Sequence, residues 1–160
     1  MSDAAAAFVA DIAARLAAEG FPRIPAGVLM ALMASEEGRL GTQELMAELG
    51  VSAAAVSGAV KYLGVLGFVR TVTAPGSRRH AYALPDTPWY TQTLTGTPRY
   101  REMAGVLEGH AGRLAGPAGA RVAEMADFFR FLDERMPLLY SEWRAGHPGT
   151  GSSPSPDVSR

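Results

Sequence analysis

Two adjacent arginines, Arg78 and Arg79, are the strongest chemical signal in this sequence. They follow Ser77 beside the tip of a predicted hairpin, in which a loop over 74–77 joins a strand over 68–72 to a returning strand over 78–84. Guanidinium groups bind phosphate oxygens through paired hydrogen bonds, and a hairpin can carry them along a nucleic-acid backbone. We therefore expect Ser77, Arg78 and Arg79 to contact the phosphates or the minor groove of double-stranded DNA.

A predicted helix over 53–66 carries a second set of candidate contacts. Its apolar residues recur every three or four positions, which predicts one buried face, and the opposite face has small side chains. A slim helix of this kind fits a major groove about 12 Å wide. Ser57 and Lys61 are hydrogen-bond donors for that groove, whereas the alanines offer only methyl contacts, for instance to thymine. The expected DNA contacts on this helix and its cap are Ser52, Ala53, Ala54, Ser57, Gly58 and Lys61.

The segment before this helix completes a predicted helix-turn-helix. Residues 43–49 are helix formers that follow a capping hydroxyl on Thr42. Gly50 suits the left-handed residue that ends a helix, and Ser52 suits the cap of the next one. Two helices joined by a short turn with glycine match the geometry of a helix-turn-helix.

Residues further upstream are expected to support the two reading helices. Residues 25–35 predict a helix that begins at Pro25, after an extended linker over 21–24. Residues 39–41 predict a short strand that joins the hairpin. The hairpin is then the wing of a winged helix.

Positive charge is concentrated in the same part of the chain. Between Arg39 and Leu84 there are five basic residues and two acidic ones, a local charge of +3, while the whole chain has a formal net charge of −1. Neutralising phosphates drives nonspecific affinity for DNA, so charge gathered on one face matters more than the total. The alternative is that these cations are ordinary surface charge.

The motifs of this central segment resemble those of the MarR-like winged-helix transcriptional regulators and, within them, the GbsR-like branch. The matching motifs are Thr-Gln-Glu-Leu at 42–45, Leu-Gly-Val-Ser at 49–52, Val-Ser-Gly-Ala-Val-Lys-Tyr-Leu at 56–63, Gly-Phe-Val-Arg at 67–70 and Gly-Ser-Arg-Arg at 76–79. The resemblance implies a homodimeric DNA-binding regulator, usually a repressor. It also allows a small-molecule effector, bound where the winged helix meets the dimer helices.

The predicted fold is mainly α with a small β-hairpin wing, a winged helix-turn-helix flanked by dimerisation helices. We expect an N-terminal dimerisation helix at 1–20, the DNA-binding domain at 21–86, C-terminal dimerisation helices at 87–145 and a disordered tail at 146–160. The tail is mostly glycine, serine, proline and threonine, which cannot bury enough surface to become ordered.

Apolar seams on the flanking helices predict a homodimer. A last helix over 118–145 would be about 42 Å long, too long for the small head alone to bury. Two-fold pairing would place two DNA-binding domains about one DNA turn apart, roughly 34 Å. The first helix is equally well explained as a cover for its own core. The expected dimer contacts are Phe8, Ile12, Leu16, Leu107, Leu114, Val122, Met125, Phe129, Leu132, Met136 and Leu139.

Trp89 and Tyr90 lie in a segment that prolines prevent from forming a regular helix. This segment is a hinge between the reading head and the C-terminal helices. The two aromatic side chains would line a ligand pocket there, or they only fill the joint.

Several classes of chemistry have no support in the sequence. The chain has no cysteine, and its three histidines, His80, His110 and His147, are far apart, so we expect no metal or other cofactor. Neither a phosphate-cradling glycine loop nor a nucleophile elbow occurs, so we expect no enzyme activity. With no signal peptide and no long apolar run, the expected location is cytoplasmic, without a membrane partner.

Two functions are compatible with these patterns. The first is a sequence-specific, double-stranded DNA-binding transcriptional regulator that acts as a homodimer. The second is a winged helix used as a protein-interaction or assembly module, because its reading face is almost bare of base-reading groups.

Overall fold

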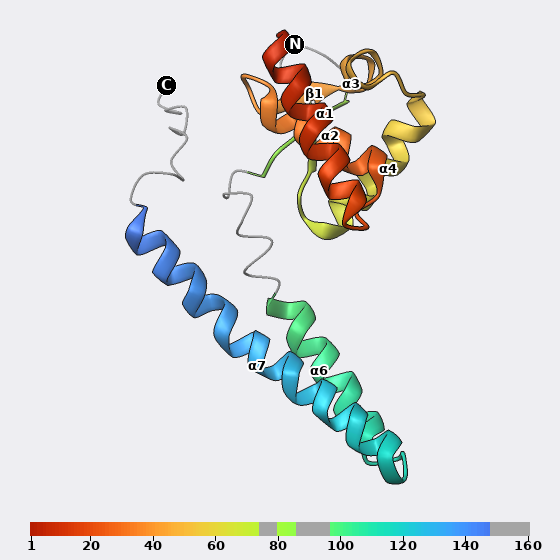
Figure 1. Ribbon diagram of the computed structural model, residues 1–160, viewed down its shortest axis with the longest axis vertical. Coiled ribbons are helices and arrows are strands. Elements are labelled where there is room, and N and C mark those ends of the chain that lie inside the picture. Colours follow the sequence, from red (N-terminus) through yellow and green to blue (C-terminus); the bar gives the residue numbers. More distant parts are fainter. Residues whose placement is uncertain (74–79, 86–96, 148–160) are drawn as a thin grey trace. The chain divides into compact units, whose positions relative to one another are not determined.

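The computed structural model describes residues 1–73, 80–85 and 97–147 (Figure 1). The chain divides into two compact units, Met1–Pro85 and Asp86–Arg160. Among the described residues, no single helix is long and apolar enough to cross a membrane.

Several predicted features fall outside the described residues. They are the wing contacts Ser77, Arg78 and Arg79, the pocket residues Trp89 and Tyr90, and the tail from residue 148 onward.

The first unit opens with α1 (Asp3–Ala18) and α2 (Arg23–Ala34). The Ser2 hydroxyl caps α1 by accepting the Ala5 N–H at 3.3 Å. The start of α2 was predicted wrongly, because Pro22 is its N-cap and Pro25 is its third residue. The first N–H groups of a helix have no partner within it, so Pro25 costs no hydrogen bond at this position.

The core of this unit forms where α2 meets α3 (Thr42–Leu49) and α4 (Ala53–Leu66). Its largest fully buried side chains are Val28, Leu32, Leu45, Val56 and Leu63. The buried residues of α4 recur every three or four positions, so the predicted apolar stripe is confirmed as the face that packs on α2 and α3.

The small sheet joins β1 (Arg39–Gly41), β2 (Arg70–Thr73) and β3 (His80–Ala83) in the antiparallel order β1-β3-β2. The predicted short strand over 39–41 is confirmed, but the strand predicted over 68–72 begins two residues later. The Phe68 N–H donates to the Leu63 carbonyl at 2.9 Å and so closes α4 instead of pairing in the sheet.

The second unit is a hairpin of α6 (Thr97–Ala111) and α7 (Gly116–Gly146). The helices meet through two small buried residues, Ala104 and Ala126. A long C-terminal helix was expected, and α7 continues without a break to Gly146. The helix before it, α6, ends at Ala111, and a turn precedes α7.

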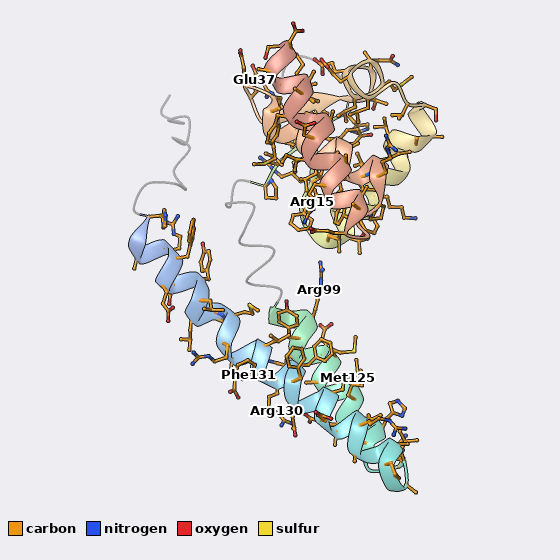
Figure 2. The ribbon with its side chains drawn as sticks, viewed as in Figure 1. Arg15, Glu37, Arg99, Met125, Arg130 and Phe131 are labelled. Carbon is orange, nitrogen blue, oxygen red and sulfur yellow. The ribbon has the colours of Figure 1, made fainter. Side chains whose placement is uncertain are left out.

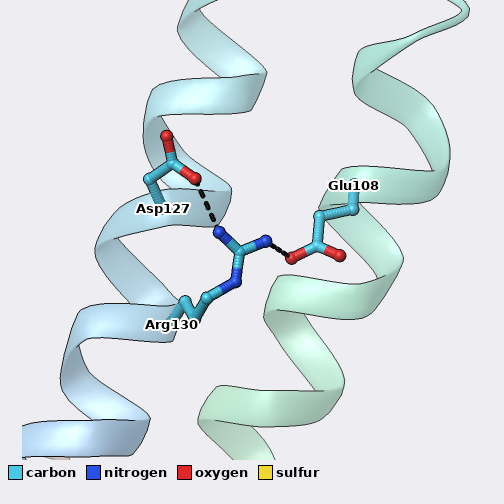
Figure 3. Close-up of polar contacts among 3 residues, drawn as sticks. All are labelled: Glu108, Asp127 and Arg130. Atoms are coloured by element: carbon cyan, nitrogen blue, oxygen red, sulfur yellow. Dashed lines mark hydrogen bonds and ion pairs between the residues drawn. The ribbon is translucent and has the colours of Figure 1, made fainter.

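Ion pairs join the two helices of the hairpin along one side. The Arg101 Nε donates to the Asp133 Oδ2 at 3.0 Å. Arg130 binds Glu108 across the hairpin and the Asp127 Oδ1 at 2.9 Å on its own helix (Figure 3). The hydrogen bond that Arg130 donates to the Glu108 carboxylate raises the pKa of the guanidinium above its usual value, so this group stays charged. Pairs this exposed contribute little stability but help to set the register.

We predict that Gly119→Ala destabilises the hairpin. A Cβ at this position would lie closer than 3.0 Å to the Leu114 carbonyl oxygen, and only a shift of the backbone would relieve the clash. The expected loss is about 1–3 kcal/mol in the free energy of unfolding, measured by chemical denaturation of the full chain. Gly109→Ala, which meets open space on α6, should instead gain about 0.5–1 kcal/mol. A Gly119→Ala variant as stable as wild type would contradict this turn geometry.

Candidate nucleic-acid interface

A sharp turn between α3 and α4 gives the first unit its helix-turn-helix (Figure 1). The chain direction bends by 107° between the two helices, within the range of this motif. Gly50 adopts the left-handed conformation (φ 64°), and its N–H donates to the Met46 carbonyl at 3.0 Å. The Ser52 hydroxyl accepts the Ala55 N–H at 3.3 Å. The prediction for this turn and its cap is therefore confirmed.

The start of α3 differs from the prediction, because Gly41 and not Thr42 is the N-cap. The Gly41 N–H donates to the Glu44 carboxylate at 2.6 Å, so one half of a capping box is present without a capping side chain. The Thr42 hydroxyl instead lies 3.4 Å from the Tyr82 hydroxyl on β3. This contact ties the helix-turn-helix to the sheet that carries the wing.

The outer face of α4 is open to solvent. The exposed residues include every predicted DNA contact on this helix and its cap: Ser52, Ala53, Ala54, Ser57, Gly58 and Lys61. The same face carries Val65, which is 71% exposed, and Tyr62, whose ring meets the Phe21 ring edge-on at 5.7 Å. These two residues were missed by the sequence analysis. Their spacing of four from Gly58 and Lys61 is the signal that would have found them.

Part of the positive charge assigned to this segment is neutralised locally. The Arg39 guanidinium lies 2.6 Å from the Glu37 carboxylate, which stands just before the counted window. The Arg70 Nε donates to the Leu84 carbonyl at 3.3 Å. The Arg39 charge is therefore less available to a ligand than the count along the sequence assumes. Lys61 remains as the cation of the α4 outer face.

Comparison with known protein families gives two matches in separate segments. Residues 19–80 match a MarR family model, and residues 87–146 match a model described as MmpR5-like MarR family transcriptional regulator. The chain carries MarR-family regulator domains. The first match spans the helix-turn-helix and its supporting helix, and the second spans the α6–α7 hairpin.

A solved structure shares the fold of this MarR-type chain. It is described as the crystal structure of a transcriptional regulator and superposes with a TM-score of 0.72, covering 88% of this chain and 98% of its own. The sequence identity is 18%, so the match supports the mainly α, winged-helix fold and nothing finer. A search of curated proteins found no match.

The predicted dimer contacts of the MarR-type hairpin fall into two groups. Phe129 and Val122 are half-buried, and the Phe129 ring lies 6.2 Å from the Tyr100 ring of α6. Leu107, Leu132 and Met136 are half-buried as well. The exposed members are Leu114, Met125 and Leu139.

Several apolar residues of the hairpin lie together on one side, whereas Phe131 and Leu138 of α7 are exposed elsewhere on the helix. At about 100° per residue, Met103 and Leu107 of α6 lie on the opposite side of Ala104 from Arg101 and Glu108. On α7 the same rotation places Met125, Leu132 and Leu139 on the opposite side of Ala126 from Arg130. We call this side the apolar face. It consists of Met103, Leu107, Leu114, Met125, Phe128, Leu132 and Leu139.

The ion pairs therefore occupy one side of the hairpin, and the apolar face occupies the other. Met125 is 49% exposed and Leu139 is 44% exposed. Met125 and Phe131 are among the side chains that extend from α7 (Figure 2).

In the first unit, α1 has two apolar stripes. Val9 and Ala13 are buried against the core, whereas Phe8 and Ile12 are exposed and Leu16 is half-buried. The helix therefore covers its own core and still presents apolar side chains outward.

A cleft of about 300 Å³ lies between α1, α2 and the turn after α3. Its walls include Ala10 and Ala14 of α1, Ile24 of α2, and Leu49 and Val51 beside the turn. No group of three or more potential metal ligands occurs among the residues in ranges 1–73, 80–85 and 97–147.

We predict that Ser52→Ala lowers the free energy of unfolding by about 1 kcal/mol, because the Ala55 N–H loses its cap. Ser52→Asp should retain wild-type stability, since a carboxylate also accepts this bond. Ser57→Ala, on the same exposed face but without a capping bond, should change stability by less than about 0.5 kcal/mol. Thermal denaturation of the three variants tests the cap, and equal stability for the two Ser52 variants would rule it out.

Proposed function

We propose that this chain is a sequence-specific, double-stranded DNA-binding transcriptional regulator that acts as a homodimer in the cytoplasm. The observation that carries this is the outer face of α4, which is exposed at the end of a helix-turn-helix bent by 107°. The MarR-family domains support the same reading. Within the family, we propose the GbsR-like branch from the resemblance of the sequence motifs alone.

In this proposal α4 enters the major groove, where Ser57 and Lys61 donate hydrogen bonds. The wing residues Ser77, Arg78 and Arg79 contact phosphates or the adjacent minor groove, as their types predict. With few base-reading groups on α4, a large share of the affinity comes from phosphate contacts. A dimer bound over a promoter excludes other proteins from the same DNA, so repression is the simplest outcome.

We predict that Lys61→Gln, and Arg78→Ala combined with Arg79→Ala, each weaken DNA binding and flatten its dependence on salt. Each phosphate contact removed should reduce the slope of log affinity against log salt by about 0.9. The measurement is a mobility-shift titration at several salt concentrations on the DNA flanking the protein's own gene. Arg15→Gln removes a cation that is paired with Glu19 on α1, and it should change neither quantity. Unchanged affinity and slope in the wing variant would count against DNA binding.

Homodimerisation is proposed on the apolar face of the hairpin. An exposed, continuous apolar surface costs free energy in water, and a second copy of the same face removes it from solvent under two-fold symmetry. The exposed Phe8 and Ile12 of α1 are separate candidates for dimer contacts in the first unit. Two paired hairpins would then hold two reading heads for successive turns of DNA.

We predict that Leu139→Glu converts the dimer to a monomer, because the new carboxylate would be buried without a partner. Ala123→Glu places the same charge on the opposite side of α7, where it stays in solvent, and should leave the dimer intact. Sedimentation at micromolar concentration distinguishes the two. A monomeric wild-type protein, or a Leu139→Glu variant that still dimerises, would exclude this interface.

A small-molecule effector is part of the proposal. The cleft beside the turn after α3 has a volume of about 300 Å³, at the lower end of small-molecule sites. Leu49 and Val51 line it, so a ligand there would press directly on the turn that sets the direction of α4. Trp89 and Tyr90 remain candidates for a pocket on sequence grounds alone.

The second candidate function is a protein-interaction or assembly module. The observation that favours it is the almost bare outer face of α4, where Ala53, Ala54 and Gly58 present no hydrogen-bonding side chain. In that case the mobility-shift assay would show no retarded DNA, and a protein partner would copurify independently of salt.

A further inference from the structure

The α4 helix lacks the side chains that usually read bases. Its 14 residues, AAAVSGAVKYLGVL, include no arginine, asparagine, glutamine, aspartate or glutamate. Paired hydrogen bonds to guanine or adenine in the major groove come from arginine, lysine, asparagine and glutamine. Lys61 is therefore the only residue of these four types on this helix, and Ser57 and Tyr62 add only hydroxyl groups. Discrimination between base pairs can then use another property of the groove.

The N-terminal turn of α4 offers methyl groups in place of donors. Ala53 and Ala54 are both exposed, and residues at this end of a recognition helix are the ones that reach base edges. In the major groove, the partner of an alanine methyl group is the C5 methyl of thymine. A contact between them removes both methyl groups from water.

Gly58 makes a close approach of the helix possible. A Cβ at Gly58 would meet no atom within 4 Å, so this part of the helix surface is open space. Gly58 is exposed and lies four residues after Ala54, on the same face of the helix. Nothing at this position holds the backbone away from the floor of a groove, and the short alanine side chains need that closeness.

We propose that α4 selects its DNA by contact between the methyl groups of Ala53 and Ala54 and thymine C5 methyls, at a distance that Gly58 permits. This inference rests on the proposed DNA-binding function and names the chemical group that the same surface recognises. Lys61 and the wing supply affinity, while the methyl contacts supply preference among sites.

Deoxyuridine provides the direct test, because it pairs as thymidine does and differs only in the missing C5 methyl. The probe is the duplex protected by the wild-type protein next to its own gene, with thymidines in each half-site replaced by deoxyuridine. Loss of one buried methyl contact should weaken binding about fourfold in each half-site, and about fifteenfold for a dimer. Deoxyuridine placed outside the protected region is the matched control and should have no effect.

Two protein variants connect this loss to α4. Ala53→Gly with Ala54→Gly removes the protein's methyl groups, so it should bind the thymidine and deoxyuridine duplexes with equal affinity. Ser57→Ala should keep the full discrimination. Gly58→Leu, which favours the helix and so preserves folding, should hold the backbone off the groove and lower affinity for the thymidine duplex to about that for the deoxyuridine duplex.

The outcomes separate this inference from the function on which it rests. If the wild-type protein retards the thymidine duplex and binds the deoxyuridine duplex equally well, methyl recognition is overturned and DNA binding stands. Discrimination that persists in the double glycine variant overturns the assignment to Ala53 and Ala54. If no duplex is retarded at all, the proposed function fails and this inference fails with it.

Discussion

Burial of one apolar stripe on α4 is the constraint on which the rest of the first unit depends. Val56 and Leu63 are fully buried against a core that includes Leu32 of α2 and Leu45 of α3. Rotating α4 about its axis would expose these side chains, at about 1.5–3 kcal/mol each. The packing therefore fixes which residues face outward, and it directs Lys61 to solvent without any contact to Lys61 itself.

The sequence was sufficient wherever a local rule acted alone. Helical spacing located α4, and the Ser52 cap and the Gly50 turn follow from side-chain chemistry and from a backbone conformation that favours glycine. The errors occurred where two rules competed for one group. The Phe68 N–H could pair in a strand or close α4, and Pro25 fits the third residue of a helix as well as the first. In both cases the tertiary structure, and not the local sequence, decides between the two possibilities.

The charge estimate failed for a related reason, because a count along the sequence ignores what lies beside each charge in space. Arg39 was counted as a cation available to DNA, but the Glu37 carboxylate neutralises it from two residues away. The positive charge expected to contact DNA then comes largely from Arg78 and Arg79. Their role is inferred from residue type and position in the sequence. The sequence therefore predicts which face of α4 is exposed, but it predicts less well the electrostatic field around that face.

The hairpin shows what a heptad pattern leaves open. Residues spaced by three and four predict that a helix has an apolar partner, but the spacing does not distinguish a helix of the same chain from one of a second copy. In α7 the small residue Ala126 is buried and Phe129 packs beside Tyr100 of α6, whereas Met125 and Leu139 are exposed. Exposed ion pairs contribute about 0–1 kcal/mol each, whereas burial of one large apolar side chain contributes about 1.5–3 kcal/mol. The charged side of the hairpin can therefore select the register of α6 on α7, whereas burial of the apolar face would supply the larger stabilising free energy.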